Sequence, residues 1–199
     1  MKVKSGIGVV VATVASLGGG FLGLSLTAKS PGNAPSGRGG AAPAYLDILS
    51  ASIVELAPEV PGVHPDDVVN RKLALRMELA GAPTCAPGPS FFGYCFLLDT
   101  DKDPSTGTTH PAFGDLGIDA RICAECDPTA GSFRSPLGDV TVSTDPGSGV
   151  TTVEILTMVG LLPSIDFRWI AAAQEDSTFV RLPALPEYEE WTTLERSRH

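Results

Sequence analysis

Short runs in which apolar and polar residues alternate are the feature that most restricts the fold of this chain. From Tyr45 onward these runs recur, and stretches rich in Gly, Pro and Asp separate them. The run 73–79 is the clearest, because its three leucines and one methionine occupy every second position. A period of two is typical of a β-strand with one buried face. No apolar helical period persists for a dozen residues in this part of the chain.

Similar runs occur along the rest of this region, centred on residues 49–54, 92–98, 118–122, 140–142, 153–155 and 167–171. Together they predict an all-β fold, an antiparallel β-sandwich or incomplete barrel of about seven to nine strands. We expect one short helix near residues 157–162, because Pro163 would end it.

The sequence divides into four segments. Residues 1–28 predict a signal peptide or an N-terminal membrane anchor, because Lys2 and Lys4 precede the uncharged stretch 6–28. We favour a cleaved general-secretion signal, with cleavage after Ser25 or Ala28, and a secreted or cell-surface location. Residues 29–43 predict a flexible Gly/Pro/Ser linker. The sandwich domain follows at 44–182, and an acidic, aromatic tail occupies 183–199.

The charge balance restricts the partners. Asp and Glu number 23 against 14 Lys and Arg. An acidic surface repels nucleic-acid phosphates and anionic lipid headgroups, so we expect no nucleic-acid partner. Contact with a membrane is expected only through the N-terminal segment, if that segment stays uncleaved.

Four cysteines, Cys85, Cys95, Cys123 and Cys126, lie in the region expected to be exported, so we predict that they form disulfides. Three pairings are possible. We favour the local one, in which Cys85 pairs with Cys95 and Cys123 with Cys126. A zinc site and a redox CxxC remain as alternatives. The spacing suits zinc poorly, and no helix signal follows the CxxC.

The most specific chemical signal is an acidic loop. Asp99, Asp101 and Asp103 follow one predicted strand at a spacing of two, and Asp115 or Asp119 precedes the next. Calcium prefers six to eight oxygen ligands, which closely spaced carboxylates can supply. We therefore predict a calcium site made by Asp99, Asp101, Asp103 and Asp119. The alternative is an ordinary solvated acidic turn, since Asp, Pro and Gly also favour turns.

Several segments resemble secreted bacterial β-sandwich domains of the DOMON and carbohydrate-binding module family 9 type. The likeness rests on FGYCFLLDTD (92–101), KDPSTG (102–107), LGIDARI (116–122), VTTVEILTMVGLLP (150–163) and FRWIAAAQED (167–176). It covers about residues 45–180. The resemblance implies a β-sandwich whose relatives bind sugars, haem or no known ligand.

No catalytic motif is evident in the sequence. The GxSxG and HExxH patterns are absent from the domain, so we expect a non-catalytic protein. The leading hypothesis is an exported module that binds a glycan or another cell-envelope ligand. A structural subunit of an envelope assembly and a hydrolase with an unrecognised carboxylate pair are the alternatives. We expect Trp169 to lie in the core and Trp191 to dock the tail onto the domain.

Overall fold

A computed structural model describes residues 26–29, 43–56, 71–85, 91–162, 164, 166–183 and 187–192 of the 199-residue chain. Of the predicted leader 1–28 and linker 29–43, residues 1–25 and 30–42 lie outside the described residues. Residues 26–29, at the junction of the two, form a strand that pairs with the strand Ile48–Glu55. Within the described ranges, no helix is long and apolar enough to cross a membrane.

The fold is all-β, as predicted. The described residues form antiparallel strands joined by loops and short 3-10 turns, the latter at Ala44–Leu46, Pro111–Phe113 and Val159–Leu161. The strands are β1 (Leu26–Lys29), β2 (Ile48–Glu55), β3 (Lys72–Leu79), β4 (Phe92–Asp99), β5 (Ala120–Asp127), β6 (Ser132–Arg134), β7 (Asp139–Thr144), β8 (Thr151–Met158), β9 (Asp166–Glu175), β10 (Thr178–Leu182) and β11 (Glu189–Thr192).

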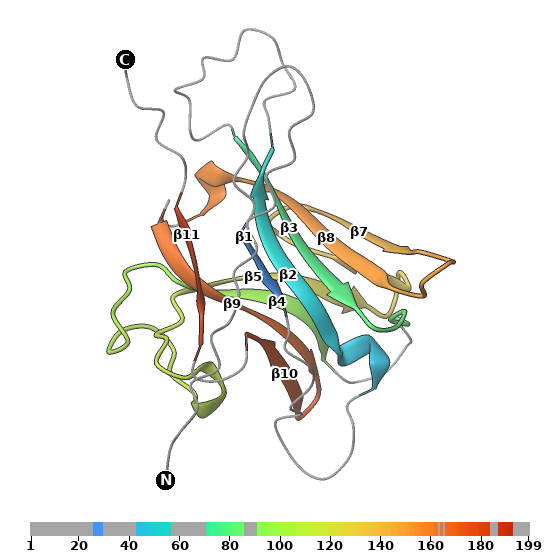
Figure 1. Ribbon diagram of the computed structural model, residues 1–199, viewed down its shortest axis with the longest axis horizontal. Coiled ribbons are helices and arrows are strands. Elements are labelled where there is room, and N and C mark those ends of the chain that lie inside the picture. Colours follow the sequence, from blue (N-terminus) through green and yellow to red (C-terminus); the bar gives the residue numbers. More distant parts are fainter. Residues whose placement is uncertain are drawn as a thin grey trace, which may run out of the picture.

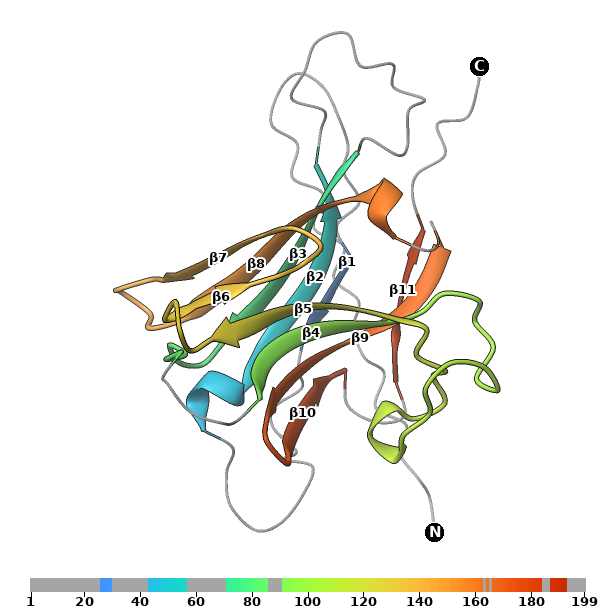
Figure 2. The same cartoon turned by 180° about the vertical axis from the view of Figure 1, so that it is seen from behind.

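The strands form two sheets that pack face to face. One sheet has the order β1-β2-β3-β8-β7, and the other has the order β10-β9-β4-β5-β6, with β11 also paired to β9. Figures 1 and 2 show β2, β3 and β8 in one layer and β4, β5 and β9 in the other. The long loop between β4 and β5 stands at the end away from the β7–β8 hairpin. This is the sandwich that the alternating runs predict.

Side chains from the inner faces of both sheets fill the core. Leu75 and Ile155 come from the first sheet, and Phe96 and Trp169 come from the second. Each of these four side chains is at most 1% exposed. The rings of Phe96 and Trp169 lie 5.5 Å apart, within the range of favourable aromatic pairs. Trp169 is therefore a core residue, as the sequence predicts.

The outer face of the second sheet carries a smaller apolar cluster. Leu97 of β4 and Ile170 of β9 point away from the main core and are buried under other parts of the chain. Leu116 and Ile118, from the loop between β4 and β5, cover them. Because β4 is buried on both faces, its sequence is apolar almost throughout rather than alternating.

Two details of the strand prediction are wrong. The alternation at residues 49–54 predicts Leu49 on the same face as Ala51 and Ile53, but Leu49 is 36% exposed while the other two are buried. The reason is a register shift between Ile48 and Ser50, which moves Leu49 out and places Ile48 in the core. The helix expected at 157–162 is also absent: β8 continues to Met158, and a single 3-10 turn follows it.

The structure pairs all four cysteines, but not in the local pattern. Cys85 is bonded to Cys126, and Cys95 is bonded to Cys123. The predicted Cys123–Cys126 bridge is wrong because both residues lie in the extended strand β5. Three residues of strand span about 10 Å and end on the opposite face, which is beyond the reach of a disulfide. Cys95 and Cys123 instead lie directly opposite each other on β4 and β5.

The predicted tail contributes a strand to the sandwich. β11 pairs with β9, and Trp191 is 5% exposed. Its ring stacks on Phe167 with the centroids 5.1 Å apart. The tail thus docks on the domain through Trp191, as predicted. Residues 193–199 lie outside the described part of the chain.

Candidate functional site

The acidic loop connects β4 to β5 and is fixed at its base by backbone pairing. The amide of Thr108 donates to the carbonyl of Ile118 over 2.8 Å, and the amide of Ile118 donates back over 3.0 Å. The amide of Asp119 donates to the carbonyl of Leu98 at 2.9 Å. These bonds bring the end of β4 and the start of β5 together, so Asp119 lies beside Asp99.

Three of the four predicted ligands converge. Asp99, Asp101 and Asp119 each place a carboxylate oxygen within 4.8 Å of the other two. Asp103 does not join this cluster: its Oδ1 accepts from the amide and the hydroxyl of Ser105 at 2.9 and 2.7 Å. Asp103 therefore caps the turn that follows it, and Asp115 is likewise outside the cluster.

Asp99 is the unusual member of the cluster. It ends β4, its side chain is fully buried, and neither carboxylate oxygen makes a hydrogen bond of regular geometry with the described residues, although the backbone amide of Lys102 lies close enough to act on its pKa. The nearest cation is Arg168 on β9, whose Nη1 lies 3.9 Å from Oδ2. That nitrogen donates instead to the carbonyl of Lys102 at 3.1 Å. Burial raises the pKa of Asp99 above its ordinary value, although the backbone amide of Lys102 and, to a lesser extent, the charge of Arg168 oppose the effect.

The other two carboxylates are exposed and partly held in place. Asp101 accepts from the amide of Asp103 at 2.9 Å and from the hydroxyl of Thr106 at 2.8 Å. These bonds lower the pKa of Asp101. Asp119 accepts from the amide and the hydroxyl of Thr100 through Oδ2, at 2.9 and 3.1 Å. Its Oδ1 accepts no hydrogen bond from the described residues.

Two glycines allow the loop to fold this tightly. Gly107 has a φ of +65°, and a Cβ atom there would lie 2.6 Å from Oδ1 of Asp119. A Cβ atom on Gly117 would lie 2.2 Å from the carbonyl oxygen of Thr106. Both contacts are shorter than any van der Waals separation. The sequence LGID therefore supplies a backbone that can pass next to the 103–106 turn.

The cluster has the chemistry of a hard-cation site. Three carboxylates within 4.8 Å of one another repel, and one of them is buried with no hydrogen bond of regular geometry from the described residues. A divalent cation would remove the repulsion and supply the missing partner for Asp99. The ligands would all be oxygen atoms, the donor type that calcium and magnesium prefer. Zinc is disfavoured, because all four cysteines are in disulfides.

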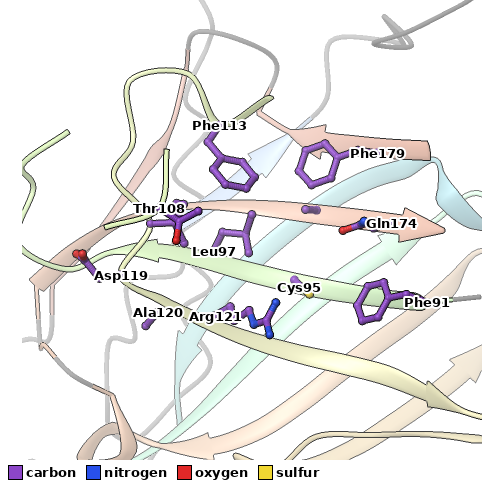
Figure 3. A pocket seen from close by; sticks show the side chains of 12 residues that line it. Phe91, Cys95, Leu97, Thr108, Phe113, Asp119, Ala120, Arg121, Gln174 and Phe179 are labelled. Atoms are coloured by element: carbon purple, nitrogen blue, oxygen red, sulfur yellow. The ribbon is translucent and has the colours of Figure 1, made fainter. Parts of the chain in front are cut away.

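A second concave feature adjoins the cluster on the outer face of the β10-β9-β4-β5 part of the sheet. It is a pocket of about 270 Å³ that shares Asp119 with the acidic cluster (Figure 3). The sequence did not predict it, because its walls come from three stretches far apart in the chain, 91–97, 108–121 and 172–179. The available signal was the nearly unbroken apolar character of β4 and of the middle of β9, which indicates burial on both faces.

The disulfides indicate an oxidising environment, and none of the four cysteines is free. Comparison of the chain with protein-family models, with curated proteins and with solved structures finds no match.

Proposed function

We propose that this chain is an exported, non-catalytic β-sandwich module that calcium stabilises and that binds a ligand outside the cell. The observation that carries the calcium part is Asp99, which is fully buried, makes no hydrogen bond of regular geometry with the described residues and lies next to Asp101 and Asp119. A buried carboxylate whose cationic neighbour lies as far as 3.9 Å away is only partly compensated, and two further carboxylates beside it favour a cation at this point.

Calcium fits this arrangement better than magnesium does. Calcium accepts six to eight oxygen atoms in flexible geometry, and three carboxylates can provide up to six. Magnesium demands a nearly ideal octahedron and keeps several of its waters. A fully buried ligand such as Asp99 leaves little room for those waters. Extracellular calcium concentrations are also high enough to occupy weak sites, which suits a protein with two disulfides.

The ligand-binding part of the proposal rests on the resemblance to sugar-binding sandwich domains. The described aromatic residues narrow the mode of binding, because both tryptophans are buried, Trp169 at 1% and Trp191 at 5% exposure. Neither can serve as an exposed platform for stacking sugar rings. The pocket beside Asp119 is therefore the place where we expect a ligand.

Calcium binding is tested by unfolding the full-length, disulfide-bonded chain in urea, with calcium and with a chelator. A ligand present at a hundredfold excess over its dissociation constant stabilises the native state by about 2.7 kcal/mol. For a domain of this size that corresponds to a rise in melting temperature of about 5–10 °C. We expect Asp99→Asn to remove this difference, because it removes the buried charge.

The matched control is Asp145→Asn. Asp145 also caps a turn with its carboxylate, accepting from the amide of Gly147 and the hydroxyl of Ser148, but it lies in the β7–β8 hairpin outside the acidic cluster. This variant should keep the full response to calcium. Equal stability of the unaltered protein in calcium and in chelator would refute the calcium proposal.

A further inference from the structure

The pocket on the outer face of the second sheet has an apolar floor and aromatic walls. Cys95 and Leu97 of β4 and Ala172 of β9 form the floor, and all three are buried. Figure 3 shows Phe113 and Phe179 on one side of this floor, with Phe91 just before the start of β4. The lining residues are Phe91, Cys95, Leu97, Thr108, Phe113, Ile118, Asp119, Ala120, Arg121, Ala172, Gln174 and Phe179.

The aromatic wall is held in position by buried contacts. The rings of Phe113 and Phe179 lie 5.9 Å apart. Phe113 belongs to the 3-10 turn Pro111–Phe113, whose Ala112 carbonyl accepts from Nη1 of Arg181 at 3.2 Å. Arg181 is only 9% exposed and also donates to the carbonyl of Pro183 at 2.8 Å. A wall fixed in this way favours ligand binding, because little ordering remains to be done when a ligand enters.

Arg121 gives the pocket a cation opposite the aromatic wall. Its position on β5 is directly across from Leu97 on β4, and its guanidinium lies near Cys95 (Figure 3). No described carboxylate forms an ion pair with Arg121, whereas arginines 71, 76, 134 and 168 all have acidic partners. Arg121 is exposed and has no acidic partner among the described residues, so its guanidinium is available to an anionic ligand that enters the pocket.

The volume limits the size of that ligand. An apolar cavity of about 150 Å³ holds one benzene molecule. The pocket, at about 270 Å³, therefore has room for one ring and a short chain. It is too small for a haem, and a long glycan would have to lie mostly outside it. Its mainly apolar and aromatic lining also suits a hydrophobic ring better than a sugar.

We propose that this pocket binds a small organic anion that consists of one apolar ring and a short chain ending in a carboxylate. The ring packs against Phe113 and Phe179, and the carboxylate pairs with the guanidinium of Arg121. This inference rests on the ligand-binding part of the proposed function and not on its calcium part.

The test uses 3-phenylpropionate as the probe, titrated into the full-length, disulfide-bonded chain with calcium present. Amide chemical shifts in NMR spectra report binding, and for a probe of this size we expect a dissociation constant in the millimolar range or tighter. The shifts should concentrate on Thr108, Ala172 and Phe179. Two comparison compounds separate the contributions of the carboxylate and of the ring to the affinity. One is 3-phenylpropanol, which lacks the carboxylate, and the other is propionate, which lacks the ring.

Arg121→Gln should weaken binding of 3-phenylpropionate by about tenfold and leave 3-phenylpropanol unchanged, because only the charge-assisted pair is lost. Arg121→Lys should restore part of the affinity. Arg134→Gln is the matched control, since it removes the same charge from the adjacent strand β6 outside the lining and should leave binding unchanged.

Three results would overturn the proposal: no shifts with millimolar 3-phenylpropionate, shifts confined to residues outside the pocket, or equal affinity in the Arg121→Gln variant and the unaltered protein. The measurement is repeated in chelator. If 3-phenylpropionate still binds in chelator while calcium fails to stabilise the fold, the calcium site is rejected and the pocket is supported. Failure of the calcium proposal is thus distinguishable from failure of the pocket proposal.

Discussion

Asp99 combines full burial and an acidic side chain with the lack of a hydrogen bond of regular geometry from the described residues. Burial favours its neutral form and raises its pKa, because the charged form loses its hydration. Asp101 and Asp103, a few residues away, behave in the opposite way: hydrogen bonds to their exposed carboxylates lower their pKa values. Protonation of Asp99 therefore stabilises the fold, whereas protonation of Asp101 or Asp103 destabilises it.

The first prediction concerns the pH dependence of stability in metal-free buffer. With a raised pKa, folded Asp99 binds its proton more tightly than the unfolded chain does. Its contribution to the free energy of unfolding therefore falls as pH rises from about 4 through the raised value, and it then stays constant. We expect Asp99→Asn to match the unaltered protein below pH 4 and to exceed it by about 1–3 kcal/mol at pH 7.

Urea unfolding at a series of pH values gives this difference directly. Subtracting one protein from the other cancels the contributions of Asp101, Asp103 and Asp145, whose lowered pKa values make stability fall on acidification. A difference that does not change with pH would mean that the Asp99 charge is already balanced in the fold, for example by Arg168.

At this scale the sequence predicted the acidic residues but not their separate roles. A spacing of two along the chain brought Asp99 and Asp101 together, and pairing of β4 with β5 added Asp119. The same spacing failed for Asp103, because Ser105 follows it and its amide and hydroxyl take up the carboxylate in a local turn. The burial of Asp99 depends on its position at the end of β4, beside β9, which spacing alone does not reveal.

At the scale of strands, the disulfides show how the two sheets are connected. The Cys95–Cys123 bond joins neighbouring strands β4 and β5 of one sheet. The Cys85–Cys126 bond joins the segment that leaves β3, in the other sheet, to the end of β5. The bonds separate their cysteines by 28 and 41 residues. By the chain-entropy relation, each should contribute about 3–4 kcal/mol to the free energy of unfolding.

The second prediction is the outcome of peptide mapping without reduction. Trypsin leaves Cys85 and Cys95 on peptide 77–102 and Cys123 and Cys126 on peptide 122–134. We expect these two peptides to be linked, whereas the local pairing would leave them separate. A further cut after Glu125, combined with chymotrypsin at Phe91 and Phe92, then separates all four cysteines. Mass spectrometry should find Cys85 with Cys126 and Cys95 with Cys123. Any other pair would contradict the observed strand register.

Strand by strand, the period-two pattern was most informative where only one face is buried. The run 73–79 and the pair Val153 and Ile155 lie in strands, as predicted. The pattern did not identify β6, β10 or β11, which are short strands near the edges of the second sheet. β6 and β10 pair with the strand just before them, and β11 pairs with β9 across a longer connection. Each of the three has five residues or fewer, so it carries little periodic signal of its own. The bulge at Leu49 is likewise set by pairing with β3.

On the scale of the whole molecule, Asp119 joins the acidic cluster to the pocket. Its carboxylate is one of the three that converge, and the same residue lines the cavity two positions before Arg121. A metal-free Asp119 repels an anion in the pocket, whereas a divalent cation on the cluster reverses the sign of that local charge. Two ligands that meet at one residue in this way should influence each other, and thermodynamic linkage makes the influence reciprocal.

The last prediction is that calcium tightens binding of 3-phenylpropionate by about fivefold or more, the lower range of measured coupling between sites. The neutral 3-phenylpropanol should bind equally well with calcium and with chelator, because it carries no charge for the cation to attract. NMR titrations of both compounds in the two conditions measure the effect. Saturating 3-phenylpropionate should in turn raise the affinity for calcium by the same factor, and Asp119→Asn should reduce the coupling in both directions.

If calcium raised the affinity of both compounds equally, ordering of the 100–118 loop rather than charge would be the cause. If calcium changed neither, the cluster and the pocket would be independent sites.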